Sequence, residues 1–348
     1  MTHHPFPVFA GRAIPCERDE TVPGGAEHQT DMRSNPWLDR RPLHYAHQGG
    51  ALEAPSTTLY AMRRAVHEHH ADALELDVHR SADGVLVVCH DTTVDRTTPS
   101  TGAIHDLTLN ELRRLDNAHW WSPGHDAIVG LADAAYVLRG RFPDDASLGI
   151  ATLDEVLVEF PDVFLNFDIK EVGPHRYEAD LADRLRAHGR STDVIVASFH
   201  DDALRAFSAY APEIHVSLGP DDTFAFYDAV TNGSAHRTLA PSQVALQVPS
   251  SFEGIDVVTP TFVDAAHRHG LAVHVWTIDD ELEMRQLLAI GVDAIMTDRP
   301  SVLAAVLATE DRELLRDRSG SRREQLVHGG EVVAQHSGLG HPTPQRGT

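Results

Sequence analysis

Residues 73–90 read ALELDVHRSADGVLVVCH, and this stretch is the most informative about the fold. Ala73 to Val78 is a short, largely apolar run that is typical of a buried strand. Val85 to Cys89 is a second such run after a short turn, whereas a parallel return would need roughly a dozen residues. We therefore expect this second run to fold back antiparallel as a hairpin arm, which brings His90 level with Asp77.

Seven further short runs rich in β-branched residues alternate with helical patterns along the chain. With Ala73 to Val78 they make eight predicted strands, the others being Leu43 to Ala46, Val163 to Ile169, Val194 to Ser198, Ile214 to Leu218, Val244 to Val248, Leu271 to Trp276 and Ala294 to Met296. The clearest helix opens at Thr259-Pro260 and closes at Gly270, which supplies an N-cap, a proline at N1 and a glycine beyond the last turn.

This alternation predicts an α/β fold with a parallel sheet and right-handed crossovers. Residues 41–308 have the ~250-residue size that is usual for a closed (β/α)8 TIM barrel, and we predict that fold for them. An open, doubly wound sheet is the alternative, but no G-x-G-x-x-G follows the first predicted strand. Residues 1–40 and 309–348 are polar without sustained periodicity, so we expect a partly irregular extension and a flexible tail.

The composition narrows the class of protein. The 29 basic and 52 acidic side chains among 348 residues give a net charge of −23, which repels nucleic acid and anionic membrane surfaces. No stretch is typical of a secretory signal, and no apolar run approaches the ~20 residues of a membrane span. The two cysteines, Cys16 and Cys89, lie far apart and form no metal-binding pair. A disulfide framework is therefore not expected, which suits a reducing cytoplasm. An anionic substrate would need positive charge supplied locally.

Charged side chains interrupt two of the predicted core strands. Glu75 and Asp77 stand at i and i+2, so both point to one face and can share a hard cation. Asn166, Asp168 and Lys170 share a face in the same way. Burying such groups against the helix layer would be costly, so we expect them at the mouth of the lumen. The alternative is a set of structural ion pairs, such as Lys170 with Asp168, that binds nothing.

His47 follows the first predicted strand and precedes Gly49-Gly50, and glycines allow a loop backbone to approach a ligand closely. One histidine among 24 is a weak signal, and a solvated loop histidine is the alternative. His47 is a candidate site residue only when it is considered together with the two strands that carry the carboxylates.

In combination, these segments resemble a known family. Ala46 to Trp121 resembles the glycerophosphodiester phosphodiesterase family through A-H-Q-G-G, A-D-A-L-E-L-D-V-H, D-G-V-L-V-V-C-H-D, D-R-T-T and L-T-L-N-E-L. Later landmarks are similar too, namely Asp168-x-Lys170, Ser198-Phe199, Val275-Trp276-Thr277 and the run from Gly291 through Thr297-Asp298 to Pro300. The resemblance implies a TIM barrel with a small insertion after the hairpin, which residues 92–150 match.

The resemblance also implies a Mg2+ or Ca2+ site and hydrolysis of glycerophosphodiesters to glycerol phosphate and an alcohol. Carried over position by position, His47 and His90 would be the acid/base pair, and Lys170 a phosphate contact. The implied metal ligands are Glu75, Asp77 and Asp168. In this interpretation His47 deprotonates the attacking water or the substrate's own 2-hydroxyl, and His90 protonates the leaving alcohol.

Three departures from the family pattern stand out. Gln48 occupies the position of an arginine, which removes a bidentate phosphate clamp from the predicted substrate-binding set. Asp168 stands where a glutamate is usual, which shortens that ligand by one methylene. Pro55-Ser56-Thr57-Thr58 replaces a proline followed by Glu-Asn-Thr, so Glu53 could serve as a ligand or Ser56 could cap the next helix; we favour the cap.

Two aromatic pairs have two interpretations each. Phe199 and Trp276, at predicted strand ends, form an apolar wall for the substrate or simply pack at the barrel mouth. Trp120-Trp121 covers the site or, as we prefer, forms the core of the insertion. The predicted partner is a small phosphodiester. The rival functions are a lysophospholipid or sphingolipid phosphodiesterase, and a barrel that binds phosphorylated ligands without turnover.

Overall fold

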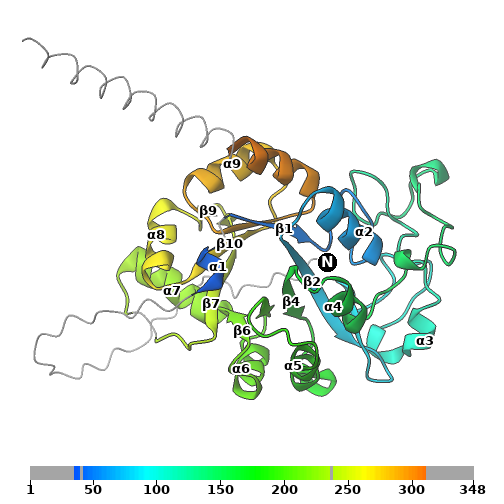
Figure 1. The fold of residues 1–348 in the computed structure, drawn as a ribbon, viewed down its shortest axis with the longest axis horizontal. Helices are drawn as coiled ribbons and strands as arrows, with labels where there is room; N and C mark the ends of the chain where they lie inside the picture. The colour runs from blue at the N-terminus through cyan, green and yellow to red at the C-terminus, as the bar shows by residue number, and fades with distance from the viewer. Residues whose placement is uncertain (1–34, 40–41, 236–237, 311–348) are drawn as a thin grey trace, which may run out of the picture. The chain divides into compact units, whose positions relative to one another are not determined.

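The structure is a computed structural model that describes residues 35–39, 42–235 and 238–310. Eight parallel strands close into a barrel, because β1 pairs with β2 on one side and with β11 on the other (Figure 1). The predicted TIM barrel and all eight predicted strands are confirmed. The barrel strands are β1 (Leu43–His47), β2 (Ala73–Arg80), β4 (Phe164–Ile169), β5 (Val194–Ala197), β6 (His215–Ser217), β7 (Gln243–Pro249), β10 (Ala272–Trp276) and β11 (Ala294–Thr297).

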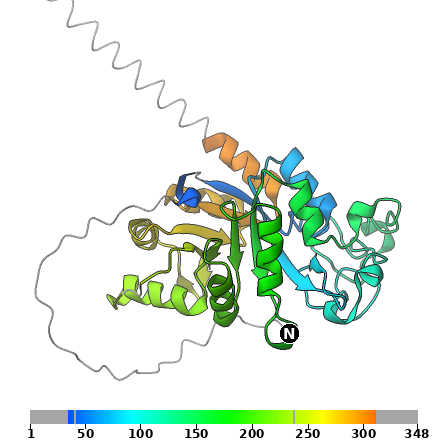
Figure 2. The ribbon, with the colours of Figure 1, turned by 60° about the horizontal axis from the view of Figure 1, so that its bottom comes forward.

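Helices follow the strands and surround the barrel (Figures 1 and 2). They are α2 (Leu59–Arg63) with the π-helix Arg64–Glu68, α4 (Leu153–Glu159), α5 (Glu178–Ala187), α6 (Asp201–Tyr210), α7 (Pro220–Asn232), α8 (Pro260–Arg268) and α9 (Glu281–Ala289), with a 3-10 turn at Gly173–His175. The predicted cap of α8 is present, since Thr259 Oγ1 accepts from Phe262 N and Gly270 has a φ of 71°. Of the described helices, none has the length and apolar character needed to cross a membrane.

The period-2 pattern of β2 explains how one strand serves both core and site. Leu74 and Leu76 belong to the apolar layer between the strands and the helices, and both are fully buried. Glu75 and Asp77 alternate with them and therefore face the lumen. The lumen side of the barrel is where both carboxylates line a cavity.

The hairpin predicted from residues 73–90 is present. β3 (Leu86–Val88) runs antiparallel to β2, with Val78 opposite Val88. The Cys89 N–H donates to the Asp77 carbonyl at 3.1 Å, so Cys89 rather than His90 is level with Asp77. The register was thus predicted one residue off, but His90 still emerges beside the carboxylates of β2.

A short helix closes the amino-terminal end of the barrel. Trp37 of α1 (Pro36–Asp39) is completely buried and packs on Phe164 at a ring-centroid distance of 4.8 Å. Asn35 Nδ2 donates to the carbonyl oxygens of Val244 and Gly270. The predicted extension 1–40 therefore contributes packed residues ahead of the expected boundary at 41; the rest of it, and nearly all of the predicted tail 309–348, lie outside the described residues.

Residues 92–150 form the predicted insertion, which lies to one side of the barrel (Figure 2). Its regular elements are brief: α3 (Leu109–Leu112) and 3-10 turns at Ile104–Asp106, Asp133–Ala135 and Ala146–Leu148. Trp121 packs in a small apolar cluster with Ala118, Leu138 and Leu148, as the core interpretation expects. Trp120 is instead part of a half-buried stack in which the Arg139 guanidinium lies 4.6 Å from its ring centroid.

A buried histidine in the lumen makes the barrel sensitive to acid. His274 on β10 is fully buried, and among the described residues neither of its ring nitrogens has a hydrogen-bond partner. Burial lowers the pKa of His274 to about 3. As pH falls below the ordinary histidine value of ~6.5, the unfolded chain takes up a proton that the folded chain cannot. Stability is therefore complete above that pH and declines below it.

We expect His274 to lower the unfolding free energy by about 2 kcal/mol at pH 5 relative to neutral pH. Each pH unit below the ordinary histidine pKa of about 6.5 contributes ~1.4 kcal/mol. His274→Leu should remove that part of the loss between pH 7 and pH 5 in urea unfolding. The exposed His125→Leu variant is the control and should keep the wild-type pH slope. An unchanged slope in His274→Leu would show that His274 is not the acid-sensitive group.

Candidate active site

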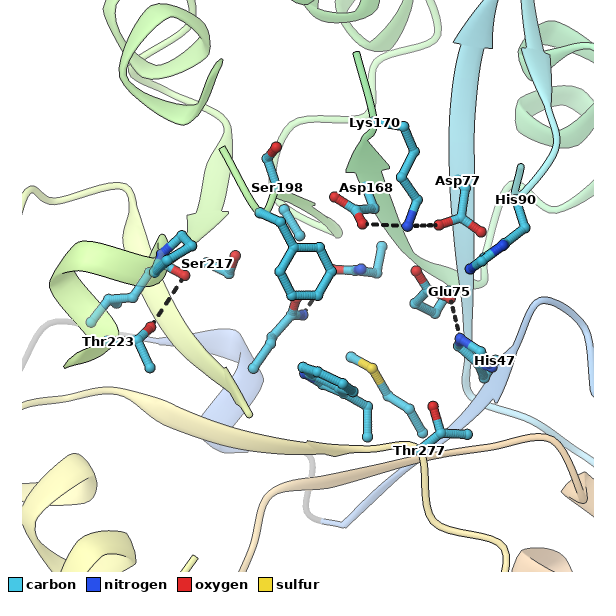
Figure 3. Close-up of a pocket in the computed structure, with 18 residues that line it drawn as sticks. His47, Glu75, Asp77, His90, Asp168, Lys170, Ser198, Ser217, Thr223 and Thr277 are labelled. Atoms are coloured by element: carbon cyan, nitrogen blue, oxygen red, sulfur yellow. Dashed lines mark hydrogen bonds and ion pairs between the residues drawn. The ribbon is translucent and has the colours of Figure 1, made fainter. Parts of the chain in front are cut away.

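A cavity of about 260 Å3 opens at the carboxyl-terminal ends of the barrel strands, where the active sites of TIM barrels lie. Figure 3 shows the labelled polar side chains converging on it from several strands, from the segments after them and from α7. Eight of the nine predicted site residues line this cavity. They are His47, Glu75, Asp77, His90, Asp168, Lys170, Phe199 and Trp276, joined by Asn166, Ala197, Ser198, Ser217, Leu218, Pro220, Thr223, Gln247, Thr277 and Met296.

Three carboxylates and one ammonium group form the charged side of the cavity. Lys170 Nζ lies 2.7 Å from Asp77 Oδ1 and 2.8 Å from Asp168 Oδ2, so the expected ion pair is in fact a bridge between two strands. Glu75, Asp77 and Asp168 are nearly buried, at 6%, 2% and 5% exposure. One oxygen of each, namely Glu75 Oε2, Asp77 Oδ2 and Asp168 Oδ1, is buried without a hydrogen-bond partner among the described residues.

The electrostatics of these groups reveal a shortage of positive charge. Burial and the charge of Asp77 raise the pKa of Glu75 to about 7. Burial opposes ionisation of Asp77 too, but Lys170 outweighs it and lowers the pKa of that carboxyl. The two carboxylates hold the pKa of Lys170 well above its ordinary value despite burial. Lys170 is therefore a permanent cation, and Glu75 is the carboxylate of the three that it does not contact.

His47 is held by a residue to which the sequence analysis gave no role. Its Nδ1 lies 2.7 Å from Asp298 Oδ1, and its Nε2 lies 3.6 Å from Glu75 Oε2. Burial alone would lower the pKa of His47, but Asp298 and Glu75 outweigh it and raise the pKa to about 9. Asp298 is itself fixed by Asp279, whose Oδ1 accepts from the Asp298 N–H.

His90 has the same arrangement on the other side of the carboxylates. Its Nδ1 lies 2.7 Å from Asp91 Oδ1, and Arg96 Nε donates to Asp91 Oδ2 at 2.7 Å. Arg96 also forms an ion pair with Asp126 in the insertion. Burial opposes protonation of His90, but the charges of Asp77 and Asp91 outweigh it and raise its pKa. Both histidines are thus held by a carboxylate at Nδ1, so that Nε2 is the nitrogen left to exchange protons with a substrate.

The insertion also explains the role of Ser56. Its hydroxyl donates to Asp126 Oδ1 at 3.1 Å and does not cap a helix. The N-cap of α2 is Thr58, whose side chain accepts from the Ala61 N–H. Our prediction of Ser56 as the cap was therefore wrong, because the helix begins two residues later than expected and Ser56 faces the insertion instead.

The alternative ligand Glu53 lies outside the cavity. Its carboxylate accepts from Ser301 N and Oγ, so it caps the helical segment after β11. Gly49 and Gly50, which the sequence analysis associated with close approach to a ligand, have a packing role in the structure. A Cβ on Gly49 would come within 2.9 Å of Ala61 Cβ, and one on Gly50 within 2.7 Å of Pro300, so both positions allow the loop to pack closely on its neighbours.

Gln48 is the one predicted site residue that does not line the cavity. It is 4% exposed, and its Nε2 lies 3.3 Å from His47 Nε2. Its Oε1 is buried without a hydrogen-bond partner among the described residues. The uncharged Gln48 amide therefore contacts Nε2 of His47.

Aromatic side chains form the opposite, apolar side of the cavity. Phe199 and Trp276 meet edge to face at a centroid distance of 5.8 Å. Lys170 Nζ lies 5.8 Å from the Phe199 ring centroid, so this wall reaches the charged side. Between the two sides, Gln247 Nε2 donates to Asn166 Oδ1 at 2.8 Å across the lumen. The cavity thus offers one charged and one apolar half.

Comparison with known proteins agrees with this geometry. The profile of the Glycerophosphoryl diester phosphodiesterase family matches residues 47–302. The chain belongs to this family. It is therefore an enzyme of the glycerophosphodiester phosphodiesterase class, as its resemblance to the family implied. The matched span contains every predicted site residue, from His47 to Trp276.

Individual relatives support the family assignment. A glycerophosphodiester phosphodiesterase of Caldanaerobacter subterraneus is 31% identical over 268 residues, which cover 76% of this chain and 96% of that protein. The crystal structure of a glycerophosphodiester phosphodiesterase from Agrobacterium tumefaciens is similar with a TM-score of 0.58 at 25% identity, covering 77% of this chain and 99% of that one. An Oleispira antarctica phosphodiesterase, solved with the product sn-glycerol-3-phosphate, shares the fold with a TM-score of 0.57 at 23% identity, covering 78% and 99%.

Proposed function

We propose that this enzyme hydrolyses glycerophosphodiesters to sn-glycerol 3-phosphate and an alcohol, with a divalent cation, Mg2+ or Ca2+, and with His47 and His90 as its acid/base pair. The observation that carries the proposal is the convergence of two carboxylate-oriented histidines on one cluster of buried carboxylates. The product bound to the Oleispira antarctica phosphodiesterase supports the same product class here.

The carboxylate cluster fits a hard divalent cation in its chemistry. Mg2+ and Ca2+ prefer oxygen ligands, and Glu75, Asp77 and Asp168 each present a buried carboxylate oxygen without a hydrogen bond. Lys170 bridges only Asp77 and Asp168, so a divalent cation would stabilise the ionised form of all three carboxylates, Glu75 included. As they stand, no three His, Cys, Asp or Glu side chains in the described part of the chain are arranged to hold a metal ion. Binding would therefore require these side chains to reorient around the cation.

The chain's own residues supply the proton transfers. His47 takes a proton from the attacking water or from the substrate's 2-hydroxyl, and the new P–O bond forms as the bond to the alcohol breaks. Attack by the 2-hydroxyl gives a cyclic phosphate, which water then opens as the histidines exchange roles: His90 takes the proton of the water and His47 returns a proton to the 2-oxygen as its bond to phosphorus breaks. His90 gives its proton to the departing alcohol oxygen, and Lys170 holds a phosphate oxygen. Asp298 and Asp91 keep Nε2 of each imidazole toward the cavity. When bound, the cation would offset charge on the phosphate and the carboxylate field that raises the pKa of His47.

The decisive test is release of choline from glycerophosphocholine with and without EDTA. We expect turnover to disappear in EDTA and to return on addition of Mg2+ or Ca2+, because the carboxylate cluster would otherwise repel the phosphate. Full activity in EDTA would exclude the metal. Absence of hydrolysis with either metal would favour the rival in which the barrel binds phosphorylated ligands without turnover.

A further inference from the structure

The two histidines of the site are supported from different parts of the chain. His47 is held by Asp298, which follows β11 of the barrel, and the Asp298 N–H donates to Asp279. Within the described residues, the side-chain hydrogen bond that orients His90 is with Asp91, which lies beyond the hairpin strand β3. The position of the His90 imidazole therefore depends on what holds Asp91.

Asp91 is held by polar contacts that lead into the insertion. Its Oδ1 lies 2.7 Å from His90 Nδ1, and its Oδ2 accepts from Arg96 Nε at 2.7 Å, so its two oxygens have separate partners. Burial opposes ionisation of Asp91, but the hydrogen bonds with His90 and Arg96 outweigh it and lower the pKa of that carboxyl. Asp91 is therefore a carboxylate whose place, and with it that of the imidazole, follows the Arg96 guanidinium.

Arg96 is fixed in turn by Asp126 of the insertion. Arg96 Nη1 donates to Asp126 Oδ2, and Ser56 Oγ donates to the other oxygen, Oδ1, at 3.1 Å. A guanidinium presents its N–H groups in a rigid planar fork, so carboxylates at Nε and at Nη1 together define its orientation. The Arg96 and Asp126 side chains are 29% and 36% exposed, so water and salt screen this ion pair less than a fully exposed one.

We infer that Asp126 is a positioning residue for His90, so that the insertion places the acid of the reaction while the barrel places the base. The inference rests on the proposed function and deepens it. Asp126 is not among the described residues that line the cavity, and it acts through Arg96 and Asp91 rather than on the substrate. It also brings a carboxylate to the side chain of Ser56, the position at which the family pattern has a glutamate.

The test uses two substrates that differ in their need for an acid. Choline leaves glycerophosphocholine as an alkoxide unless it receives a proton, whereas para-nitrophenol is acidic enough to leave the para-nitrophenyl ester of glycerol phosphate as an anion. Asp126→Ala should lower kcat/KM for choline release about 10- to 10²-fold, because misplacing a reacting group by ~1 Å can cost the upper figure. It should lower kcat/KM for nitrophenol release less than about threefold, since that step needs no acid.

A second variant tests whether Arg96 needs the carboxylate itself. Ser56 Oγ lies 3.1 Å from one oxygen of Asp126, and Arg96 binds the other oxygen. A glutamate at position 56 would therefore reach Arg96 from the place of the missing side chain. Ser56→Glu in the Asp126→Ala background should restore choline release to near the wild-type kcat/KM.

Asp133→Ala is the matched control. Asp133 is also a carboxylate of the insertion that pairs with an arginine, Arg139, at 3.0 Å, but its side chain is 99% exposed and its loss leaves the contacts of Arg96 in place. This variant should keep the wild-type kcat/KM for both substrates. Choline release by the wild type reports separately on the proposed function.

Nitrogen NMR of the histidine side chains gives the same comparison without turnover. The His90 signal, assigned by its loss in His90→Ala, should shift in Asp126→Ala and stay unchanged in Asp133→Ala, because only the first variant frees Arg96 and Asp91. An Asp126→Ala variant that loses both substrates equally, or a His90 signal that is the same in Asp126→Ala as in the wild type, would overturn the inference.

Discussion

His90→Ala should lower turnover of glycerophosphocholine about 10²- to 10⁴-fold, the usual contribution of a positioned general acid. The side chain is 40% exposed, so its removal takes no apolar core contact away. Asp91 keeps its bond to Arg96 in the variant, and the hairpin register depends on backbone groups of β2 and β3. The loss should therefore appear in kcat with an unchanged unfolding midpoint.

A suitable control is His188→Ala. His188 also pairs with a carboxylate, Asp154, at 3.1 Å, but it lies at the end of α5 and does not line the cavity. That variant should keep wild-type turnover, because its imidazole cannot reach the phosphate. If His90→Ala hydrolyses glycerophosphocholine as fast as His188→Ala does, His90 is not the acid and the role of the hairpin must be reassigned.

The barrel could be predicted because its strands are short β-branched runs, each followed by a helix with recognisable caps. The alternation of leucine with acid in β2 also predicted which side chains share the lumen. The register of the hairpin was less certain, because a turn of a few residues can close in more than one way. The hairpin turn closes so that Cys89 lies opposite Asp77, whereas we had predicted His90 there.

The residues that hold the two catalytic-site histidines in place could not be predicted from the sequence, because they are brought together only by the fold. Asp298 and His47 are 251 positions apart and meet only because β1 pairs with β11 and closes the barrel. Asp91 was visible next to His90, but only coordinates show that its second oxygen is engaged by Arg96. Trp37 sits in a polar segment without periodicity, so no pattern predicted that it would close the barrel floor.

Lys170 is the only lysine in the sequence, whose other 28 basic residues are arginines. A compact ammonium group can lie between two carboxylates on adjacent strands, whereas the planar arginine fork needs more room. Lys170→Met would leave Asp77 and Asp168 buried without their shared cation. We expect a loss of about 3 kcal/mol in unfolding free energy in EDTA, near the low end for breaking a buried ion pair because Lys170 is 20% exposed.

Activity of Lys170→Met should fall about 10²- to 10³-fold, as when one stabilising donor is lost. Its unfolding free energy should recover in Ca2+ or Mg2+ more than that of the wild type, because the carboxylates then gain a cation they lack. Arg186→Met is the control: Arg186 bridges Asp183 and Glu213 on the surface, so its loss should cost less than about 1 kcal/mol with no metal dependence. A Lys170→Met variant as stable as Arg186→Met in EDTA, and indifferent to metal, would mean that the cluster does not need the positive charge on which the proposed mechanism depends.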